Sequence, residues 1–402
     1  MQQSTQLTLH ENVQFIYELV LARMELAAAG VEFEANDNLR GFSTNGSIDR
    51  EALMCRSAYV MSLQLPHQEP EFTDYHHIQQ YNQTRSINQY LTHWFYPYKG
   101  KFHPQMIRAL LGIIGAGPGD RVLDPFIGSG TTAIEAQLLG MDCVGMDVSP
   151  LCCLISRVKT QSWAHLNDIE EASEYVAPCV RNTMQQRLFR TPDDREFPEG
   201  PVKDFFDLAE MIARSDNSRR RRDPVDAFVH NRDKMLRSVQ DHVAVKERLG
   251  LDFGEVEIVE GDARSLDLPD ESIDGIVTSP PYSIALNYVK NDEHALEAMG
   301  YDVDVIGEEF IGVRGRGQER FELYDHDMRE CAREMKRVLK PGSMAAVVIG
   351  NMTYKGEEID TTGMFIEACE DAGMTLERSV DKIIFGLYNV MQKEYILLLR
   401  RP

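Results

Sequence analysis

The sequence has little that would place the chain in a membrane. It contains no run of about 18 uncharged apolar residues, the length that a transmembrane helix needs. Charged side chains such as Arg108, Asp124 and Glu135 interrupt its most apolar stretch. The first residues lack a basic segment followed by an apolar one, so no secretory signal is expected. These absences favour a cytoplasmic protein.

Cysteine is sparse and follows no pattern. The seven cysteines include the neighbours Cys152 and Cys153, but none of them forms the CxxC pair typical of zinc sites and thiol redox motifs. An odd, scattered set of this kind fits a reducing compartment better than a disulfide framework. We therefore expect no metal site.

Positive charge is scarce for a protein that would coat nucleic acid. Lys and Arg number 42 against 64 Asp and Glu, which gives a formal net charge of −22. Proteins that bind nucleic acid over a whole surface are usually basic. An enzyme that acts on nucleic acid needs only a local basic face, so the charge disfavours such a substrate without excluding it.

The N-terminal part of the chain is expected to form a separate region, residues 1–95, made of helices. Thr8 to Glu11 resembles a capping box, and apolar residues follow at helical spacing. A second helix is expected from Asp49 to Leu63. The aromatic stretch between Glu69 and Tyr98 is either a connector that packs on the next domain or an interaction surface.

The rest of the chain alternates apolar strands with helices in two blocks, residues 96–160 and 255–402. This rhythm predicts one α/β domain with a doubly wound, mostly parallel sheet. Residues 161–254, which lie between the second and third strands, are charged and irregular and are predicted to be a helical insertion.

A basic run marks this insertion. Over residues 211–240, eight basic side chains face four acidic ones, and four of the basic ones are consecutive: Arg219, Arg220, Arg221 and Arg222. Such a run is either a solvated surface or an arm that contacts phosphates, because arginine presents a forked donor to phosphate oxygens.

A glycine turn follows the first strand of the α/β region, within Asp124–Thr132. Gly128 and Gly130 allow a tight turn and a close approach of the backbone to a ligand. The helix that follows offers free N–H groups to a carboxylate or phosphate. Asp147 ends the next strand, where an acidic residue commonly holds ribose hydroxyls. The turn lacks the lysine of ATP-binding loops and the third glycine of the dinucleotide fingerprint. It predicts a ligand with a nucleoside and an anionic end, or else a turn without a ligand.

A second motif, Thr278–Tyr282, ends another apolar strand, at an edge of the sheet where ligands bind in open α/β folds. Pro280 and Pro281 fix the backbone and leave carbonyls as acceptors, because proline has no N–H. The Ser279 hydroxyl and the Pro280 carbonyl suit the N–H bonds of a planar amine, and Tyr282 suits its ring. The alternative is a rigid turn that caps the strand.

Together, Asp124–Thr132 and Thr278–Tyr282 resemble the amino-methyltransferases, which use S-adenosylmethionine to methylate exocyclic amines of DNA bases. The resemblance covers residues 96–160 and 255–402 and implies a class I methyltransferase fold, with a Rossmann-like sheet of seven strands. The serine form of the second motif looks most like the cytosine-N4 branch. It implies a site-specific DNA methyltransferase that forms N4-methylcytosine, as in restriction-modification systems, with a cognate restriction endonuclease as a candidate partner.

Three alternatives to this function stay open. The first is a DNA methyltransferase that forms N6-methyladenine by the same chemistry. The second is an enzyme that methylates a base amine of ribosomal or transfer RNA. The third is a non-catalytic module that only binds the cofactor.

The resemblance also implies roles for individual residues. Asp124 would face the methionine amino group of the cofactor, Asp147 its ribose, and Asp262 its adenine amino group. The other implied cofactor residues are Lys101, His103, Phe126, Gly128, Gly130, Thr131, Thr132 and Ala263. The catalytic set would be Ser279, Pro280, Pro281 and Tyr282. Nucleic acid would meet Asn287, Tyr288, Arg314 and Arg316, besides the four arginines of the insertion.

Overall fold

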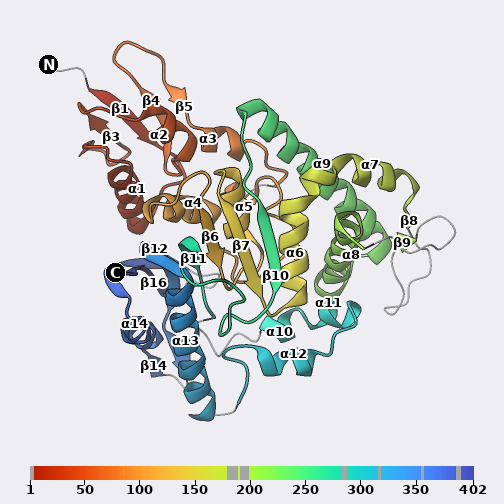
Figure 1. Ribbon diagram of the computed structural model, residues 1–402. Helices are drawn as coiled ribbons and strands as arrows, with labels where there is room; N and C mark the ends of the chain where they lie inside the picture. The colour runs from red at the N-terminus through yellow and green to blue at the C-terminus, as the bar shows by residue number, and fades with distance from the viewer. Residues whose placement is uncertain are drawn as a thin grey trace.

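A seven-stranded sheet forms the centre of the computed structural model, which describes residues 4–84, 86–178, 189–190, 199–281, 288–315, 318–354, 357–385 and 391–402. The strands lie in the order β10-β7-β6-β11-β12-β16-β15 (Figure 1). In chain order they are β6 (Arg121–Asp124), β7 (Asp142–Asp147), β10 (Val256–Glu260), β11 (Ile273–Thr278), β12 (Leu339–Gly350), β15 (Thr375–Phe385) and β16 (Met391–Arg400). Neighbouring strands from β10 to β12 run parallel, and β16 is antiparallel to both of its neighbours. The predicted doubly wound, mostly parallel sheet is confirmed.

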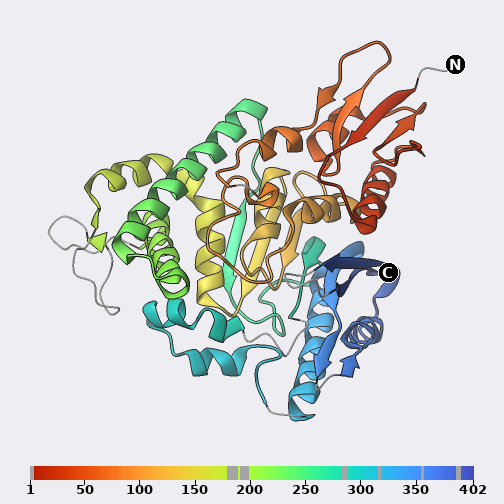
Figure 2. The same cartoon turned by 180° about the vertical axis from the view of Figure 1, so that it is seen from behind.

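Helices cover both faces of this sheet. Successive strand residues point to opposite faces, so Val122 packs with α4 (Pro104–Ile113) and α5 (Thr131–Leu138), whereas Leu123 packs with α13 (Gln318–Val338) and α14 (Thr361–Asp371). α6 (Pro150–Gln161) continues the row begun by α4 and α5 (Figure 2). The central strands β6 and β11 are therefore mostly buried, whereas the edge strands β10 and β15 mix apolar with charged residues.

The order of the strands reverses between β6 and β11. From β6 the chain proceeds through β7 to β10 at one edge, whereas β11 starts the other half of the sheet. Gly275 and Ile276 of β11 pair with Val122 and Leu123 of β6. Ligands of open α/β sheets bind at such a reversal, at the carboxyl ends of the strands. The two predicted motifs follow these two strands, so the topology brings them side by side.

The N-terminal region is not the helical region that the sequence predicts. It contains a five-stranded antiparallel sheet with the order β2-β3-β1-β4-β5, which projects from one end of the molecule (Figure 1). Its elements are β1 (Thr5–Leu9), α1 (Ile16–Ala28), β2 (Glu34–Ala35), β3 (Gly41–Thr44), α2 (Arg50–Arg56), β4 (Val60–Gln64), β5 (Glu71–Phe72), α3 (Asp74–Gln79) and η1 (Ile87–Gln89).

Pairing between distant segments explains this difference. Leu7 lies opposite both Phe42 of β3 and Leu63 of β4, and Leu7 and Leu9 are buried on one face of β1. The segment expected as a capping box is therefore the end of a strand. The first helix begins later, where the Glu18 carboxylate accepts the N–H groups of Gln14 and Phe15 at 2.7 and 3.0 Å.

The segment after α6 is mostly helical in its described residues. It comprises η2 (Ser162–His165), α7 (Leu166–Tyr175), β8 (Ala177–Pro178), β9 (Phe189–Arg190), α8 (Pro201–Arg220) and α9 (Pro224–Leu249). These helices pack on α6 through an apolar cluster that includes Phe205, Phe206 and Phe228. Phe95 joins the same cluster and Tyr90 is also buried, so these aromatic residues pack inside as a connector.

Short elements complete the carboxyl side of the sheet. They are α10 (Tyr288–Asn291), α11 (Glu293–Ala298), α12 (Val303–Glu309) and the hairpin of β13 (Met352–Tyr354) and β14 (Glu357–Ile359). Within the described ranges, no helix is long and apolar enough to cross a bilayer.

Candidate active site

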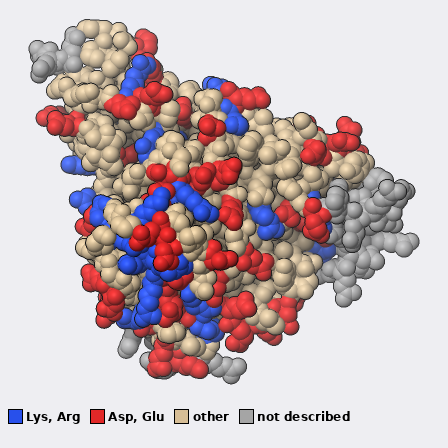
Figure 3. Space-filling view, viewed as in Figure 1, with Lys and Arg blue, Asp and Glu red and all other residues tan. Residues whose placement is uncertain are grey.

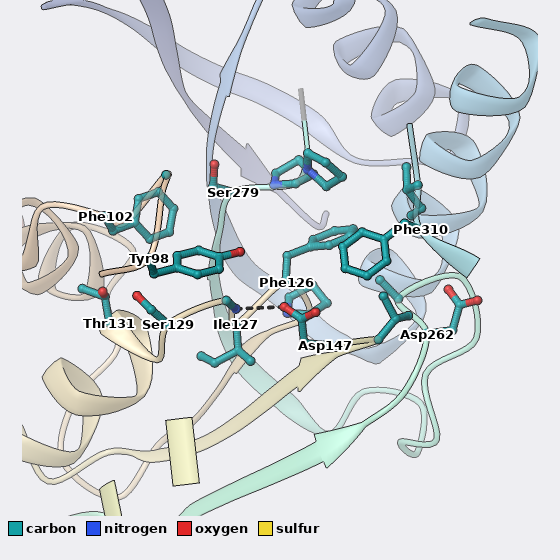
Figure 4. A pocket seen from close by; sticks show the side chains of 18 of the residues that line it. Tyr98, Phe102, Phe126, Ile127, Ser129, Thr131, Asp147, Asp262, Ser279 and Phe310 are labelled. Carbon is teal, nitrogen blue, oxygen red and sulfur yellow. Dashed lines mark hydrogen bonds between the residues drawn. The ribbon is translucent and has the colours of Figure 1, made fainter. Parts of the chain in front are cut away.

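A cavity of about 850 Å³ opens at the carboxyl ends of the central strands (Figure 4). Its walls come from segments far apart in the sequence: residues 98–102, 125–131, 147–148, 261–263, 279–281 and 309–311. Both predicted motifs therefore contribute to one cavity.

The two motifs meet at the Asp124 carboxylate, which ends β6 and is 1% exposed. One of its oxygens accepts from the Thr278 hydroxyl of β11 at 2.6 Å and from the Phe126 N–H at 3.1 Å. The other accepts from the Thr132 hydroxyl at 2.7 Å. Burial raises the pKa of Asp124 to about 6, although these donors oppose the rise. The carboxylate thus fastens the glycine turn and α5 to the end of β11.

These bonds correct two expectations about the cofactor. Asp124 and Thr132 do not line the cavity. In the protein interior, the Thr132 hydroxyl donates to the Asp124 carboxylate. Asp124 therefore does not face the cavity as a partner for a methionine amino group. Its structural role is to hold the two strand ends together.

The glycines of the turn have different roles. Gly128, with φ of 50°, lines the cavity, and its N–H donates to Asp147 at 3.0 Å (Figure 4). Gly130, with φ of 78°, does not line the cavity. A Cβ there would lie 2.9 Å from the Ser156 hydroxyl, so this glycine lets α6 approach closely.

Asp147 lies at the end of β7 and lines the cavity. Its second oxygen accepts the Ser149 N–H at 2.9 Å, which fixes the carboxylate at the start of α6. Burial raises the pKa of Asp147 to about 6, and the two backbone donors only partly offset this effect. A further hydrogen-bond donor on a ligand would stabilise the charged form.

The cavity fits a nucleoside that carries a charged end. The Thr131 hydroxyl at the start of α5 is buried in its wall and has no hydrogen-bond partner among the described residues. Phe126, Phe310 and Ile311 supply apolar surface (Figure 4). A buried hydroxyl at the start of α5, the Asp147 carboxylate and apolar surface therefore meet in one cavity, a combination that suits S-adenosylmethionine.

Asp262 and Ala263 line the cavity where the resemblance implies the adenine. The Arg264 side chain donates to both oxygens of Asp262, at 2.9 Å from Nε and 2.6 Å from Nη2. Although burial opposes it, this pairing lowers the pKa of Asp262. Asp262 is therefore held as an ionised acceptor at the wall.

The segment before α4 meets the cavity only in part. Lys101 lines it, but its ammonium donates to the carbonyl of His93, and burial lowers the pKa of Lys101 to about 7. His103 is the N-cap of α4, bonds to Asn88 and does not line the cavity. Burial lowers the pKa of His103 to about 4. His103 is therefore part of the support behind the cavity wall rather than of the wall itself.

Ser279, Pro280 and Pro281 line the cavity at the end of β11. The Ser279 hydroxyl donates to the Val348 carbonyl of β12 at 2.8 Å. Because its one hydrogen is used in this way, the oxygen keeps its lone pairs to accept from another donor. Tyr282 lies outside the described residues.

Of the residues predicted to contact nucleic acid, those whose side chains the structure describes do not line the cavity. Arg220 and Arg222 pair with Asp216 at 3.2 and 3.4 Å, Arg221 is the C-cap that follows α8, and Arg314 pairs with the buried Asp327. Figure 3 shows blue and red side chains intermixed on this face of the molecule rather than one basic surface. Asn287, Arg316 and the side chains of Arg219 and Tyr288 lie outside the described part.

Sequence reasoning missed several wall residues, including Tyr98, Phe102, Ser129, Phe310 and Ile311. Tyr98 and Phe102 flank Lys101 in the aromatic stretch, and this proximity is a signal that could have found them. In Figure 4 they lie on the same side of the cavity as Ser129 and Thr131, opposite Phe310 and Asp262. Phe310 follows α12 and has no local signal.

Comparisons with known proteins point to methyl transfer. A family profile described as "RMKL-like, methyltransferase domain" matches residues 95–302. The chain is 37% identical over 93 residues to the type II methyltransferase M.MjaII of Methanocaldococcus jannaschii, covering 23% of this chain and 17% of that protein. It is 39% identical over 121 residues to the type II methyltransferase M.BsoBI of Geobacillus stearothermophilus, covering 30% and 24%.

A third curated relative is the tRNA (guanine(10)-N2)-dimethyltransferase of Methanothermobacter thermautotrophicus, with 44% identity over 55 residues, 14% of this chain and 16% of that protein. Among solved structures, TrmN from Thermus thermophilus has 15% sequence identity and a TM-score of 0.36, with 76% of this chain and 50% of that chain covered. The chain spans less than a quarter of the length of the first two curated relatives.

The Asp124 junction predicts a stability effect at Thr278. Thr278→Val keeps the shape but removes a hydroxyl that donates to a buried carboxylate, so the free energy of unfolding should fall by about 1.5–3 kcal/mol. Urea unfolding measures this loss. Thr375→Val, at an exposed position of β15, is the control and should change it by less than about 0.5 kcal/mol. Equal effects of the two changes would contradict the role of the junction.

The raised pKa of Asp147 predicts how cofactor binding depends on pH. Ribose hydroxyls donate better to a carboxylate than to a carboxylic acid, so affinity should fall as the pH drops through about 6. Asp147→Asn should bind about tenfold more weakly at neutral pH and lose this dependence. Calorimetric titration with S-adenosylmethionine measures both effects, with Glu247→Gln, an exposed change on α9, as control. Unchanged affinity in Asp147→Asn would refute the ribose contact.

Proposed function

Because the chain belongs to the RMKL-like methyltransferase domain family, whose cofactor is S-adenosylmethionine, we propose that it methylates an exocyclic amine of a nucleic-acid base. One observation carries this proposal. Ser279 and the two prolines after it line the same cavity as Gly128 and Asp147. The acceptors after β11 therefore lie in the same cavity as the residues at the ends of β6 and β7, which suit a nucleoside cofactor.

The cofactor would be held by residues of three strand ends. Asp147 accepts from the ribose hydroxyls, and Asp262 accepts from the adenine amino group between Phe126 and Phe310. Thr131 and the N–H groups at the start of α5 hold the charged end. When bound, S-adenosylmethionine supplies a methyl carbon activated by its positive sulfur.

The catalytic residues would act on the amine as acceptors. The lone pair of an exocyclic amine is conjugated with the ring, so the amine is a weak nucleophile. Ser279 and the Pro280 carbonyl would accept hydrogen bonds from its two N–H groups, which favours a tetrahedral nitrogen and stabilises the positive charge that develops there. The N–CH3 bond would form as the S–CH3 bond breaks and leaves a neutral thioether, and the cationic amine would then release one N–H proton to water. Tyr282 stacks on the flipped base. Positioning of this kind needs no covalent bond between protein and base.

Cytosine N4 in DNA is the target that we propose first. The serine form of Ser279–Tyr282 supports cytosine N4. The two relatives named type II methyltransferases support DNA as the polymer but do not bear on the base. Adenine N6 uses the same chemistry and is the nearest alternative. A restriction endonuclease as partner belongs to this proposal only if the target is DNA.

An RNA base is the second candidate. The relative named as a tRNA dimethyltransferase acts, by its name, on guanine N2, which is also an exocyclic amine. The net charge of −22 favours a nucleic acid that is bound through a small local contact surface over one that is bound along its length.

The insertion would help to hold the nucleic acid. In this proposal the methyltransferase domain is formed by residues 96–160 and 255–402, and residues 161–254 bring Arg219 to Arg222 to the phosphates. Arg220 and Arg222 share Asp216, but their side chains are 61% and 51% exposed. Exposed ion pairs are weak, so phosphate oxygens can replace the carboxylate.

Nucleoside mass spectrometry tests the target directly. DNA and RNA are each incubated with the enzyme and S-adenosylmethionine labelled in the methyl group, then digested to nucleosides. Label in N4-methylcytosine supports the leading proposal, and label in another N-methylated nucleoside identifies an alternative. Label on carbon or oxygen atoms alone, or in no nucleoside, would refute methylation of an amine.

Ser279→Ala should separate chemistry from cofactor binding. Loss of one acceptor for the developing charge should lower kcat about 10²–10³-fold. The Kd for S-adenosylmethionine should stay within about twofold, since Ser279 is not proposed to hold the cofactor. Ser272→Ala is a matched control, because this hydroxyl also donates to a backbone carbonyl, at 2.7 Å, just before the amino end of β11. Near-normal turnover of Ser279→Ala would contradict the role of Ser279 as an acceptor for the target amine.

A further inference from the structure

A buried carboxylate next to the cavity binds two arginines. Asp327, on α13, is 1% exposed. Its oxygens accept from Arg264 at 3.1 Å and from Nε of Arg314 at 3.2 Å. No part of the proposed reaction uses Asp327, and a buried carboxylate is costly unless its partners are well placed. The proposed reaction therefore does not explain why this carboxylate is buried beside the cavity.

Arg264 connects this carboxylate to two walls of the cavity. Besides Asp327, its guanidinium donates to both oxygens of Asp262 and, at 3.2 Å, to the Glu309 carbonyl. Asp262 and Glu309 both line the cavity, from the end of β10 and from the end of α12. Two aspartates and two arginines make the cluster electrically neutral. Arg264 is shared between Asp262 and Asp327, whereas Arg314 pairs with Asp327.

The wall that follows Glu309 bridges two apolar cores. Phe310 packs against the cluster formed by α6, α8 and α9, whereas Ile311 belongs to the cluster beneath α13. The chain crosses here from α12 to α13 (Figure 1). Arg264 fixes this crossing at the Glu309 carbonyl, and Arg314 fixes it from the other side through Asp327.

We propose that Arg264 and Asp327 are positioning residues that couple the cofactor to the wall formed by Glu309, Phe310 and Ile311. This inference rests on the proposed cofactor position beside Asp262. Asp327 takes part of the charge of Arg264 and thereby leaves Asp262 able to accept from a ligand. Because the same guanidinium holds Glu309, a ligand on Asp262 stabilises the wall, and the wall strengthens ligand binding by the same factor.

The test compares two neighbouring aspartates on α13. Asp327→Asn removes the charge that both arginines share. Asp325→Asn is the matched control, since Asp325 pairs with Arg329 at 3.0 Å on the outer side of the helix, where it is 31% exposed. Two quantities are measured for each protein: the Kd for S-adenosylmethionine, and amide hydrogen exchange of residues 309–313 with and without it.

In the unaltered protein and in Asp325→Asn, the cofactor should slow exchange of residues 309–313 by about tenfold. In Asp327→Asn this protection should disappear, and the Kd should rise about tenfold. A purely structural ion pair gives a different result: the urea midpoint of Asp327→Asn falls, but its Kd and protection match those of Asp325→Asn. That result would overturn the inference.

A second variant covers the case in which Asp327→Asn does not fold. Arg314 is 25% exposed, and Arg314→Gln should likewise lose the cofactor-dependent protection of residues 309–313. Protection equal to that of the unaltered protein would overturn the coupling. If the unaltered protein does not bind S-adenosylmethionine, the proposed function fails and this inference with it. Binding without coupling defeats the inference alone.

Discussion

The hydrogen bonds of the buried Asp124 carboxylate are the interaction on which the site depends. They join the ends of β6 and β11, the two strands between which the sheet reverses its order. A carboxylate in the interior is destabilised by the loss of water, and its pKa of about 6 reflects that cost. Donors from Thr278, Thr132 and Phe126 offset it only if both strand ends stay in place. The geometry of the cavity and the ionisation of Asp124 therefore support each other.

The remaining polar groups of the cavity follow one principle, which is that bonds within the protein orient each acceptor toward the space between the strands. The Ser279 hydroxyl donates its hydrogen to a carbonyl of β12. Two backbone N–H groups donate to Asp147, and Arg264 donates to Asp262. Ser279 and Asp147 retain lone pairs that can accept from a ligand at the wall. Such fixed acceptors suit a reaction in which positive charge moves from sulfur to nitrogen, because little reorganisation accompanies the transfer.

The sheet and the two motifs were predictable because their signals are local. Alternating apolar strands and helices indicate the α/β fold, and strand-end chemistry placed Gly128, Asp147 and Ser279 at one edge. The N-terminal sheet was not predictable, because Leu7 gains its partners from Phe42 and Leu63, far along the chain. The hydrogen bonds of the buried Asp124 and the contact of Gly130 with α6 also depend on tertiary packing, which a local sequence pattern does not reveal. Phe310 reaches the cavity only through the packing of two cores, which no local pattern encodes.

We propose that one cavity brings a methyl donor and a base amine together at the carboxyl ends of neighbouring parallel strands. A crystal structure with bound S-adenosylmethionine tests it most directly. The account predicts the ribose at Asp147 and the methyl carbon directed toward Ser279, separated from its oxygen by about the width of one amine nitrogen, roughly 5–6 Å. A methyl carbon directed away from Ser279, or a cofactor bound outside this cavity, would contradict the account.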